Sequence, residues 1–345
     1  CNDGSKRTRI DFLEQHSNSK HTSAIALFSG GLDSILAVKW MQNLGFRVYA
    51  AHFSAPYLPP EKAIHYAREN GIELIVRDIT AEHLQMMQNP VHGFGKHHNP
   101  CIDCHGLMFR MAGKLMEELG AGFLISGEVL GQRPMSQHRN ALRAVEKLSG
   151  YGDLIVRPLS QKLLEDTKPV REGWVDKATL LDISGRSRNR QMAMAAEMGI
   201  TYPAPGGGCL LTDKSYTLRL RELLDRGEGS PENIRLLRWG RHFRLADGIK
   251  LIVGRNQADN EGLQREAYHG IYLKLRDWKG PLGLLTSGEV SGDLLARAAS
   301  IVLSYSGKAT SPAYVKYGID NICDREILVG KLGEAELKQD MIAYD

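Results

Sequence analysis

Six residues near the start of the chain have the composition of an anion-binding turn: Ser29, Gly30, Gly31, Leu32, Asp33 and Ser34. They follow an apolar run at 24–28 and precede a helix-like stretch at 35–42. In a turn between a strand and a helix, the backbone N–H groups point inward and the helix dipole adds partial positive charge. The two glycines let the backbone approach a phosphate closely, and the serines add hydroxyl donors. A Walker-type lysine is missing, so we predict a phosphate site of another kind.

Three cysteines have a spacing that suits ligand chemistry. Cys101 and Cys104 form a C-x-x-C pair where a helix is expected to begin, and the positive dipole there favours the thiolate. Cys209 follows the glycine-rich loop 204–208, which can bring it to a second element. Three thiolates fit a 4Fe–4S cluster with one iron left for an external sulfide. Cys323 stands alone in the tail, where we expect a buried structural thiol.

Other uses of these thiols stay open. Zinc needs two ligands beyond the C-x-x-C pair, and His97, His98 and His105 are near enough in sequence to supply them. A mechanism without metal would carry sulfur as a persulfide on Cys209, with Cys104 or Cys101 resolving it. Thioredoxin-type exchange is a further interpretation of the pair.

The stretch before residue 200 alternates apolar strands with helices. Strands are expected at 24–28, 47–53, 72–76, 123–125 and 154–156, and helices at 33–43, 59–70, 101–119, 136–148, about 161–175 and 187–199. This rhythm predicts an α/β fold with a doubly wound parallel sheet. In such sheets ligands bind beyond the carboxyl ends of the strands. Five residues stand at those ends and are expected to converge: Ser29, His52, Asp78, Ser126 and Arg157.

The pattern changes after residue 203. From 240 on the sequence is richer in strand-forming residues, and Asp247-Gly248 between two alternating runs is a hairpin signal. We predict three segments: a polar N-terminal stretch at 1–20, a larger α/β domain at 21–235, and a smaller α+β domain at 236–345.

Composition limits the class of protein. A chain of 345 residues is long enough for two domains, and its net charge of +4 is by itself weak support for a nucleic-acid partner. No apolar run approaches ~18 residues, so neither a membrane span nor a membrane partner is expected. The N-terminal stretch lacks an apolar signal core, and five cysteines do not make a disulfide scaffold at this length. We expect a cytoplasmic location.

Two groups of basic residues could contact nucleic acid. The first lies where the tail begins and is interleaved with Trp239 and Phe243: Arg241, Arg244, Lys250 and Arg255. Such a mixture suits a surface that follows a polynucleotide backbone, although a solvated helix face before an ordinary β core would look the same. The second group, Arg186 and Arg188, would either reach phosphates near the active site or begin a solvated helix.

With these motifs, residues 24–210 resemble the PP-loop tRNA thiouridine synthetases, which have the PP-loop ATP pyrophosphatase (adenine nucleotide alpha hydrolase-like) fold. The matching segments are SGGLDS at 29–34, HFSAPYLPPEKA at 52–63, NPCIDCHGLMFRMA at 99–112, SGEVLGQRPMSQ at 126–137 and IVRPL at 155–159. The order C-x-x-C and then one later Cys is similar to the cluster-dependent thiolases. The resemblance implies that ATP binds at the turn, with Asp33 as the phosphate or Mg²⁺ partner. It also places His52 and Phe53 near adenosine, and Gly127 and Gln132 near the nucleotide.

The tail, over about 240–318, resembles the RNA-binding domain of the NFACT family. The matching segments are GRHFRLADGIKLIVGRNQADNEGL at 240–263 and LLARAASIVLSYSGKATSPAYVKYG at 294–318. Together the two resemblances imply a tRNA sulfurtransferase, which transfers sulfur to a tRNA uridine through an adenylated base. Asp33 and the cysteines at 101, 104 and 209 would be catalytic. A cysteine desulfurase or free sulfide would donate the sulfur, and homodimerisation stays open.

Two alternatives from other classes remain at this point. One is a PP-loop ligase or desulfidase that acts on a small molecule, with the tail serving oligomerisation. Activity on a free nucleoside would favour it. The other is a non-catalytic RNA-binding protein with a relict nucleotide site, which an absence of pyrophosphate release would favour.

Overall fold

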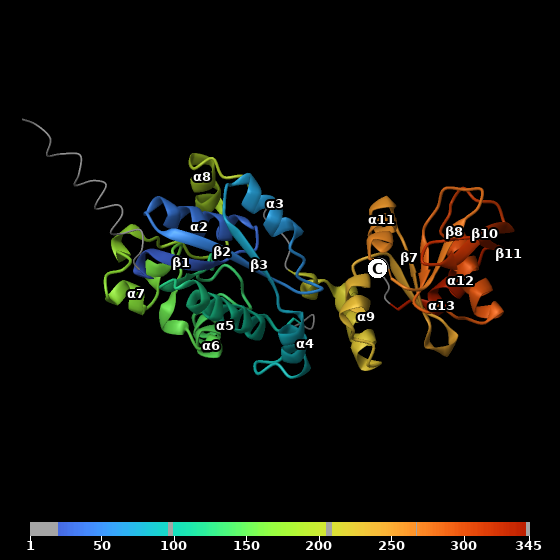
Figure 1. Ribbon diagram of the computed structural model, residues 1–345, viewed down its shortest axis with the longest axis horizontal. Coiled ribbons are helices and arrows are strands. Elements are labelled where there is room, and N and C mark those ends of the chain that lie inside the picture. Colours follow the sequence, from blue (N-terminus) through green and yellow to red (C-terminus); the bar gives the residue numbers. More distant parts are fainter. Residues whose placement is uncertain (1–19, 96–98, 205–208, 267, 343–345) are drawn as a thin grey trace, which may run out of the picture. The chain divides into compact units, whose positions relative to one another are not determined.

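The chain forms two compact units, 1–207 and 208–345. The structure, a computed structural model, describes residues 20–95, 99–204, 209–266 and 268–342 (Figure 1). Among these described residues, each unit has a sheet of its own, with five strands in the first unit and six in the second. Within the described ranges, no helix is both long and apolar enough to cross a membrane.

The sheet of the first unit is parallel throughout, in the order β3-β2-β1-β4-β5. Its strands are β1 (Ser23–Leu27), β2 (Arg47–Ser54), β3 (Leu74–Asp78), β4 (Phe123–Ile125) and β5 (Ile155–Val156). The central strand is buried on both faces, which is why it appears in the sequence as an unbroken apolar run. The order reverses at β1, which confirms the predicted α/β fold with a doubly wound parallel sheet.

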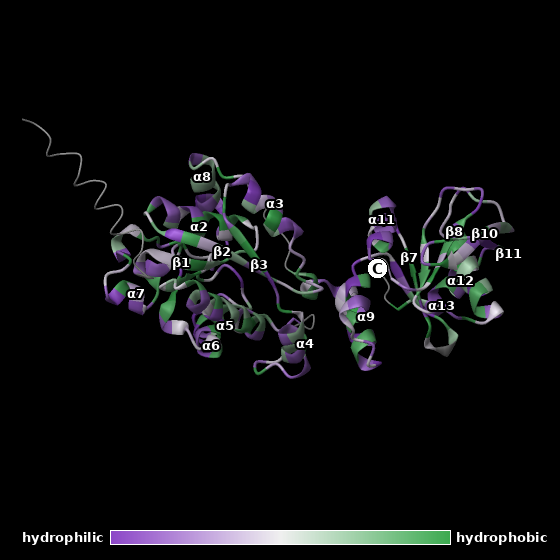
Figure 2. Ribbon diagram, viewed as in Figure 1, coloured by the Kyte–Doolittle hydropathy of each residue, from purple (hydrophilic) through white to green (hydrophobic). Residues whose placement is uncertain are grey.

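Helices cover both faces of this sheet (Figure 1). They are α2 (Leu32–Asn43), α3 (Glu61–Glu69), α4 (Thr80–Gln88), α5 (Cys101–Leu119), α6 (Arg139–Ser149), α7 (Lys168–Arg171) and α8 (Asn189–Glu197). Short 3-10 turns lie at η1 (Lys20–Thr22), η2 (Gly152–Leu154), η3 (Gln161–Leu163) and η4 (Lys177–Thr179). One apolar core joins α2, α3 and α8 to the sheet, and a second joins α5 and α6 to its other face. Figure 2 shows the strands as the hydrophobic layer between helices of mixed polarity.

The segment 161–175 differs from the long helix expected there. It forms η3 and then the one-turn α7, with Pro169 in the first turn of that helix. Proline lacks an N–H group and its ring displaces the preceding helical turn, so a helix begins at this point rather than running through it. Helix α4, by contrast, was not expected from the sequence.

The second unit is built on an antiparallel sheet in the order β11-β10-β8-β9-β7-β6. Its strands are β6 (Arg241–Arg244), β7 (Lys250–Val253), β8 (Ile271–Leu275), β9 (Gly283–Leu285), β10 (Ala313–Ile319) and β11 (Arg325–Val329). The other elements are η5 (Leu210–Thr212), α9 (Lys214–Asp225), α10 (Pro231–Leu236), η6 (Ala246–Gly248), α11 (Gln257–Arg265), α12 (Gly292–Ser304) and α13 (Glu334–Asp340). Strands β6 and β7 form the expected hairpin, and α12 packs its apolar side chains against the sheet. This unit is the predicted α+β domain.

Helix α9 belongs to the second unit, whereas the sequence analysis assigned everything before residue 236 to the larger domain. Arg219 of α9 donates a hydrogen bond to the Gly240 carbonyl at 3.1 Å. Arg244 of β6 forms ion pairs with Glu222 of α9 at 2.7 Å and with Glu228 at 2.9 Å. Because these contacts hold α9 to β6, the division between the units falls at 207–208.

Candidate functional site

The glycine turn links the end of β1 to the start of α2. Gly31 directly precedes the first turn of α2, and Gly30 has a φ of 68°, in the left-handed region. A Cβ at Gly30 would lie 2.8 Å from the Lys62 carbonyl oxygen, so a larger residue would displace α3. The first N–H groups of α2 have no acceptor within the helix and are directed out of its N-terminus. The turn therefore has the shape and polarity of the predicted phosphate site.

The two serine hydroxyls bond within the turn. Ser34 Oγ donates to the Gly31 carbonyl at 2.9 Å and lies 3.3 Å from Ser29 Oγ. The N–H of Gly31 donates to Ser29 Oγ at 3.4 Å. The two contacts of Ser29 Oγ are long, whereas the Ser34 bond has an ordinary length. A hydroxyl can rotate its proton towards a stronger acceptor such as a phosphate oxygen.

Strand β4 brings a further glycine against the turn. Gly127 follows the strand after Ser126, and a Cβ there would lie 2.5 Å from the Asp33 carbonyl oxygen and 2.7 Å from the Ser34 nitrogen. Only glycine permits this approach of two backbones. Gly127, expected near the nucleotide, thus packs directly on the glycine turn.

A chain of side-chain amides holds Asp33. Gln132 Nε2 donates to Asp33 Oδ2 at 2.5 Å, and Gln191 Nε2 of α8 donates to Gln132 Oε1 at 2.8 Å. Arg188 Nε lies 3.8 Å from the same Asp33 oxygen. The structure therefore brings together Asp33, Gln132 and Arg188, which the sequence analysis had placed in separate motifs. It adds Gln191, which sequence reasoning missed because a lone glutamine in a helix carries no signal.

The other oxygen of Asp33 fits a magnesium ion. Oδ1 is buried and has no hydrogen-bond partner among the described residues. Burial raises the pKa of this carboxyl group, although the hydrogen bond from Gln132 opposes the change. A divalent cation at Oδ1 would offset the cost of burying the charge, and a carboxylate oxygen is the ligand that Mg²⁺ prefers.

The two residues expected near adenosine point different ways. His52 donates from Nδ1 to the Phe28 carbonyl at 2.9 Å, just before the glycine turn. Phe53 is buried and packs in the core with Ile79 and Phe109. Successive side chains of a strand face opposite sides of the sheet, so both cannot reach one ligand. The Phe53 side chain therefore serves the core, and only its backbone is left for the predicted adenosine contact.

The C-x-x-C pair begins α5, as predicted. Asn99 Nδ2 donates to Cys101 Sγ at 3.0 Å, and Cys104 Sγ lies 3.2 Å from His83 Nε2. The Tyr57 hydroxyl is hydrogen-bonded to His83 Nδ1. Burial lowers the pKa of His83 to about 4, so its imidazole is neutral at pH 7. Sequence reasoning missed this buried Tyr–His–Cys chain, because the helix that carries His83 was not anticipated.

The cluster and zinc hypotheses are both left as predictions. Over the ranges that the structure describes, no group of three or more His, Cys, Asp or Glu side chains is arranged to hold a metal ion. Cys209 belongs to the second unit, and the proposed ligands His97 and His98 lie outside the described residues. The fourth thiol, Cys323, is half-buried and donates to the Tyr272 carbonyl at 3.6 Å.

A buried ion-pair chain connects the start of α5 to the carboxyl ends of β4 and β5. His105 Nδ1 lies 2.9 Å from Glu128 Oε1, and Arg157 Nε lies 2.9 Å from Glu128 Oε2. Arg157 also pairs with Glu146 of α6 at 2.5 Å. Burial alone would raise the pKa of Glu128, but the charges of Arg157 and His105 lower it to about 2. Arg157, which we expected in the ligand crevice, is instead buried and links Glu128 to Glu146.

The predicted RNA-contacting residues of the tail divide into two kinds. Lys250 is 3% exposed, and burial lowers its pKa to about 8. Arg244 is committed to the two glutamates described above, and Arg255 pairs with Asp259 at 2.7 Å. Arg241 alone of the four lies over an aromatic ring, that of Tyr305, at 4.5 Å. Three of these four cations are therefore either buried or paired with acidic side chains.

A lysine pair that sequence reasoning missed lies elsewhere on the same sheet. Lys274 of β8 and Lys316 of β10 are directly opposite each other. Neither forms an ion pair with any residue in the described part of the chain. Arg276, two residues after Lys274 and just beyond the end of β8, lies 4.1 Å from the ring of Tyr314. Like charges opposed across two strands are unfavourable unless an anion offsets them. Only the strand register, which the sequence does not reveal, makes this pair visible.

Comparisons with known proteins agree with both resemblances. Residues 19–162 match the family model described as thiamine biosynthesis protein (ThiI), and residues 240–341 match the NFACT protein RNA binding domain. A probable tRNA sulfurtransferase of Thermococcus kodakarensis is 29% identical over 117 residues, which are 31% of this chain and 30% of the relative. The chain thus spans less than a third of the length of the curated relative it matches.

Two solved structures are also similar. A 4-thiouridine synthetase in complex with RNA and bound ATP is 22% identical over 52% of this chain and 50% of its own, with a TM-score of 0.33. A predicted subunit of tRNA methyltransferase from Methanocaldococcus jannaschii is 18% identical over 61% of this chain and 91% of its own, with a TM-score of 0.37. The family matches confirm that the first unit resembles the ThiI family and that the second unit resembles the NFACT RNA-binding domain.

Proposed function

We propose that this protein, which carries a ThiI-family domain followed by an NFACT RNA-binding domain, is a tRNA sulfurtransferase that activates a uridine with ATP. The observation that carries the proposal is a chain of contacts in the first unit. Gly127 packs on Asp33 and Ser34 of the glycine turn, and the next residue, Glu128, pairs with His105 beside Cys104. These contacts connect the glycine turn, where we propose that ATP binds, to the C-x-x-C pair through the end of β4.

The first step would be adenylation of the base. The uridine carbonyl oxygen attacks the α-phosphorus of ATP, an oxygen–phosphorus bond forms, and the bond to the β-phosphate breaks to release pyrophosphate. The ring N3–H of the base gives up its proton to solvent in the same step. The first N–H groups of α2 and the hydroxyls of Ser29 and Ser34 would stabilise the charge on the phosphates. Asp33, oriented by Gln132, would hold Mg²⁺, which when bound neutralises the phosphate oxygens. His52 and the backbone at Phe53 would lie beside adenosine.

The second step would be displacement of AMP. A sulfur nucleophile attacks the ring carbon, a carbon–sulfur bond forms, and the carbon–oxygen bond breaks so that AMP leaves. We propose Cys101, Cys104 and Cys209 as the ligands of a 4Fe–4S cluster, which when bound would offer one iron for sulfide. In the alternative route, Cys209 would carry a persulfide received from a cysteine desulfurase, and its outer sulfur would attack the ring carbon. Cys104 or Cys101 would then attack the Cys209 sulfur, which releases the thiolated base and leaves a disulfide for an external thiol to reduce.

The tRNA partner would be held by both units. The second unit would bind the backbone through its NFACT domain, where Arg241 and the Lys274–Lys316 pair have the suitable charge. In the first unit, Arg186 is exposed and Arg188 adjoins Asp33, so both would contact RNA close to the nucleotide. The target base must leave its stack to present a carbonyl oxygen. We place this reaction, which uses ATP and tRNA, in the cytoplasm.

One experiment tests the whole proposal. The protein, kept anaerobic, is incubated with ATP, Mg²⁺, sulfide and unmodified tRNA, and pyrophosphate and thiolated nucleosides are measured by enzymatic assay and mass spectrometry. We expect pyrophosphate release that requires tRNA, followed by a thiouridine. Equal release with a free nucleoside would instead support a small-molecule ligase or desulfidase. No release under any condition would leave only an RNA-binding role.

A further inference from the structure

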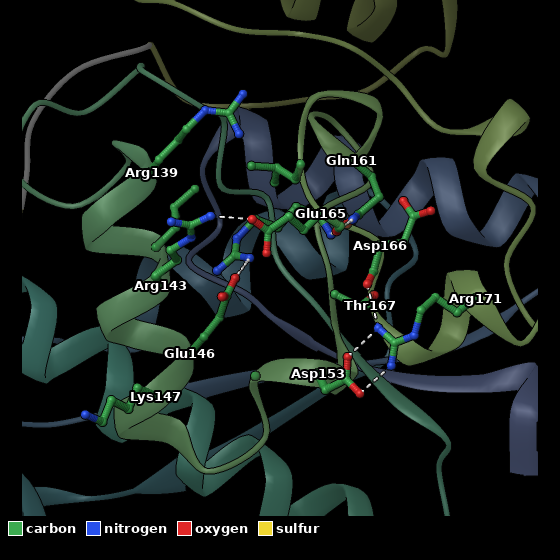
Figure 3. Close-up of a pocket in the computed structure, with 14 residues that line it drawn as sticks. Arg139, Arg143, Glu146, Lys147, Asp153, Gln161, Glu165, Asp166, Thr167 and Arg171 are labelled. Atoms are coloured by element: carbon green, nitrogen blue, oxygen red, sulfur yellow. Dashed lines mark hydrogen bonds and ion pairs between the residues drawn. The ribbon is translucent and has the colours of Figure 1, made fainter.

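The first unit has a cavity beside α6, whose lining does not include the glycine turn. Its volume is about 370 Å³, and it lies between α6, η2, η3 and the start of α7 (Figure 3). Two buried polar atoms of its lining, Arg157 Nη2 and Thr167 Oγ1, have no hydrogen-bond partner within the described ranges. Arg157 is 2% exposed and Thr167 is 9% exposed. A guanidinium N–H and a hydroxyl left unpaired in one cavity both call for a hydrogen-bond acceptor.

The charge in the cavity that no ion pair neutralises is positive. Each carboxylate in the lining is held by a cation: Glu146 by Arg157, Asp153 by Arg171, Glu165 by Arg143 and Asp166 by Lys177. Figure 3 shows the Arg143–Glu165 and Arg171–Asp153 pairs on different sides of the cavity. Arg139, one helical turn before Arg143 on α6, is exposed and forms no ion pair with a described residue. The acceptor that fits is therefore an anion.

The ion pair between Arg143 and Glu165 lies at the entry to Arg157, and this contact is weak. The side chains of Arg143 and Glu165 are 62% and 78% exposed, and ion pairs so open to water contribute little to stability. An incoming phosphate could replace the Glu165 carboxylate on Arg143 at small cost. It would then reach Nη2 of Arg157, whose other nitrogens are already held by Glu128 and Glu146.

We propose that this cavity binds a phosphate group of the tRNA backbone through Arg139, Arg143, Nη2 of Arg157 and the hydroxyl of Thr167. The proposal rests on the proposed tRNA substrate and adds to it a contact in the first unit, apart from the NFACT domain. Arg157 pairs with Glu128, which pairs with His105 next to Cys104, so the bound phosphate would lie one buried ion-pair chain away from the thiols. An arginine held on two sides by carboxylates presents its remaining N–H groups in a fixed direction, which suits an oxyanion.

The test compares full-length variants of equal charge. Arg139→Gln with Arg143→Gln removes two cations from the cavity, and the control Lys39→Gln with Arg68→Gln removes two from α2 and α3, on the other face of the sheet. We expect the cavity variant to bind tRNA at least about tenfold more weakly and to lower the slope of log affinity against log salt by about one to two. The control should stay within about twofold of the wild type.

A second comparison uses a substitution that should strengthen tRNA binding. Glu165→Gln removes the carboxylate that competes for Arg143, so tRNA should bind several-fold more tightly than to the wild type. Its control, Asp182→Asn, removes another exposed carboxylate, which pairs with Arg190, and should have no such effect. Thr167→Val, which keeps the side-chain shape, should weaken binding without lowering the unfolding temperature, because the hydroxyl makes no bond that folding requires.

Distinct outcomes separate the ideas. If cavity and control variants lose affinity equally, the proposal is overturned and only the general charge matters. If inorganic phosphate raises the unfolding temperature of the wild type but not of the Arg139 and Arg143 variant, while tRNA affinity is unchanged, the site takes a free phosphate and the RNA contact is refuted. If the wild type does not bind tRNA, the proposed function itself fails.

Discussion

Gln132 Nε2 donates to Asp33 Oδ2 at 2.5 Å, and this bond ties the loop after β4 to the first turn of α2. The two residues are 99 positions apart in the chain. The bond fixes one carboxylate oxygen and leaves the other, which is buried, for a ligand. The activity of the glycine turn should therefore depend on Gln132, which lies in a different loop from the turn.

Asp33→Asn should abolish tRNA-dependent pyrophosphate release, with a loss of about 100-fold or more, because charge stabilisation at the phosphates is lost. The amide keeps the size of the side chain, so the fold should persist. Ser34→Ala should act in the same direction. Asp182→Asn, at an exposed surface ion pair, is the control and should release pyrophosphate at the wild-type rate. Undiminished release by both site variants would show that the turn does not bind ATP.

Gly127→Ala should disable the nucleotide site by crowding rather than by loss of a group. The added methyl would lie 2.5 Å from the Asp33 carbonyl oxygen, so the strand exit and the turn must separate. We expect a cost of about 1–3 kcal/mol and loss of ATP binding, measured by denaturant unfolding and calorimetry. Gly292→Ala is the control, since nothing lies within 4 Å of its added carbon. Normal ATP affinity in the Gly127 variant would contradict the contact.

Acid should weaken the first unit through Glu128. Its folded pKa of about 2 lies below the unfolded value of 4.5, so its contribution is complete above pH 4.5 and is lost as the pH falls towards 2. A difference of this size corresponds to about 3 kcal/mol. Glu128→Gln should flatten the stability profile in that window. It should also destabilise the protein at pH 7 by about 3 kcal/mol, because Arg157 would lose a buried partner. A variant profile parallel to that of the wild type between pH 4.5 and 2 would refute the assignment.

The tail should bind RNA through exposed cations rather than paired ones. Lys274→Gln with Lys316→Gln should weaken tRNA binding severalfold, while stability stays level or rises as the opposed charges are removed. Arg244→Gln should instead lower stability and leave tRNA binding unchanged, because it leaves Glu222 and Glu228 without their partner. Filter binding and thermal unfolding measure the two effects. Loss of affinity in the Arg244 variant alone, at unchanged stability, would favour the basic group first predicted from the sequence.

The three cysteines should act together if they hold a cluster. Anaerobic protein should then show a broad iron–sulfur absorption with about four irons per chain. Ala at any one of Cys101, Cys104 and Cys209 should remove both the absorption and thiolation, whereas Cys323→Ala should be nearly silent. Tight zinc, or full activity without iron, would move the chemistry to a persulfide.

The sequence by itself determined the parts whose signal is local. The glycine turn, the alternation of strands and helices, the C-x-x-C pair at a helix start and the hairpin at 247–248 each depend on residues close together in the chain. Local propensity and spacing are enough for such features. The long helix expected at 161–175 shows the limit even here, since Pro169 outweighed the helical pattern around it.

Only the tertiary structure decided which side chains meet. Gln191 and Gln132 reach Asp33, and Tyr57 and His83 reach Cys104, across separations that no spacing rule reveals. Folding likewise buried Lys250 and committed Arg244 to glutamates, while the register of β8 and β10 placed the exposed Lys274 opposite the half-buried Lys316. Charge is visible in a sequence, but its availability to a ligand depends on burial and on partners, and both arise only when distant segments pack together.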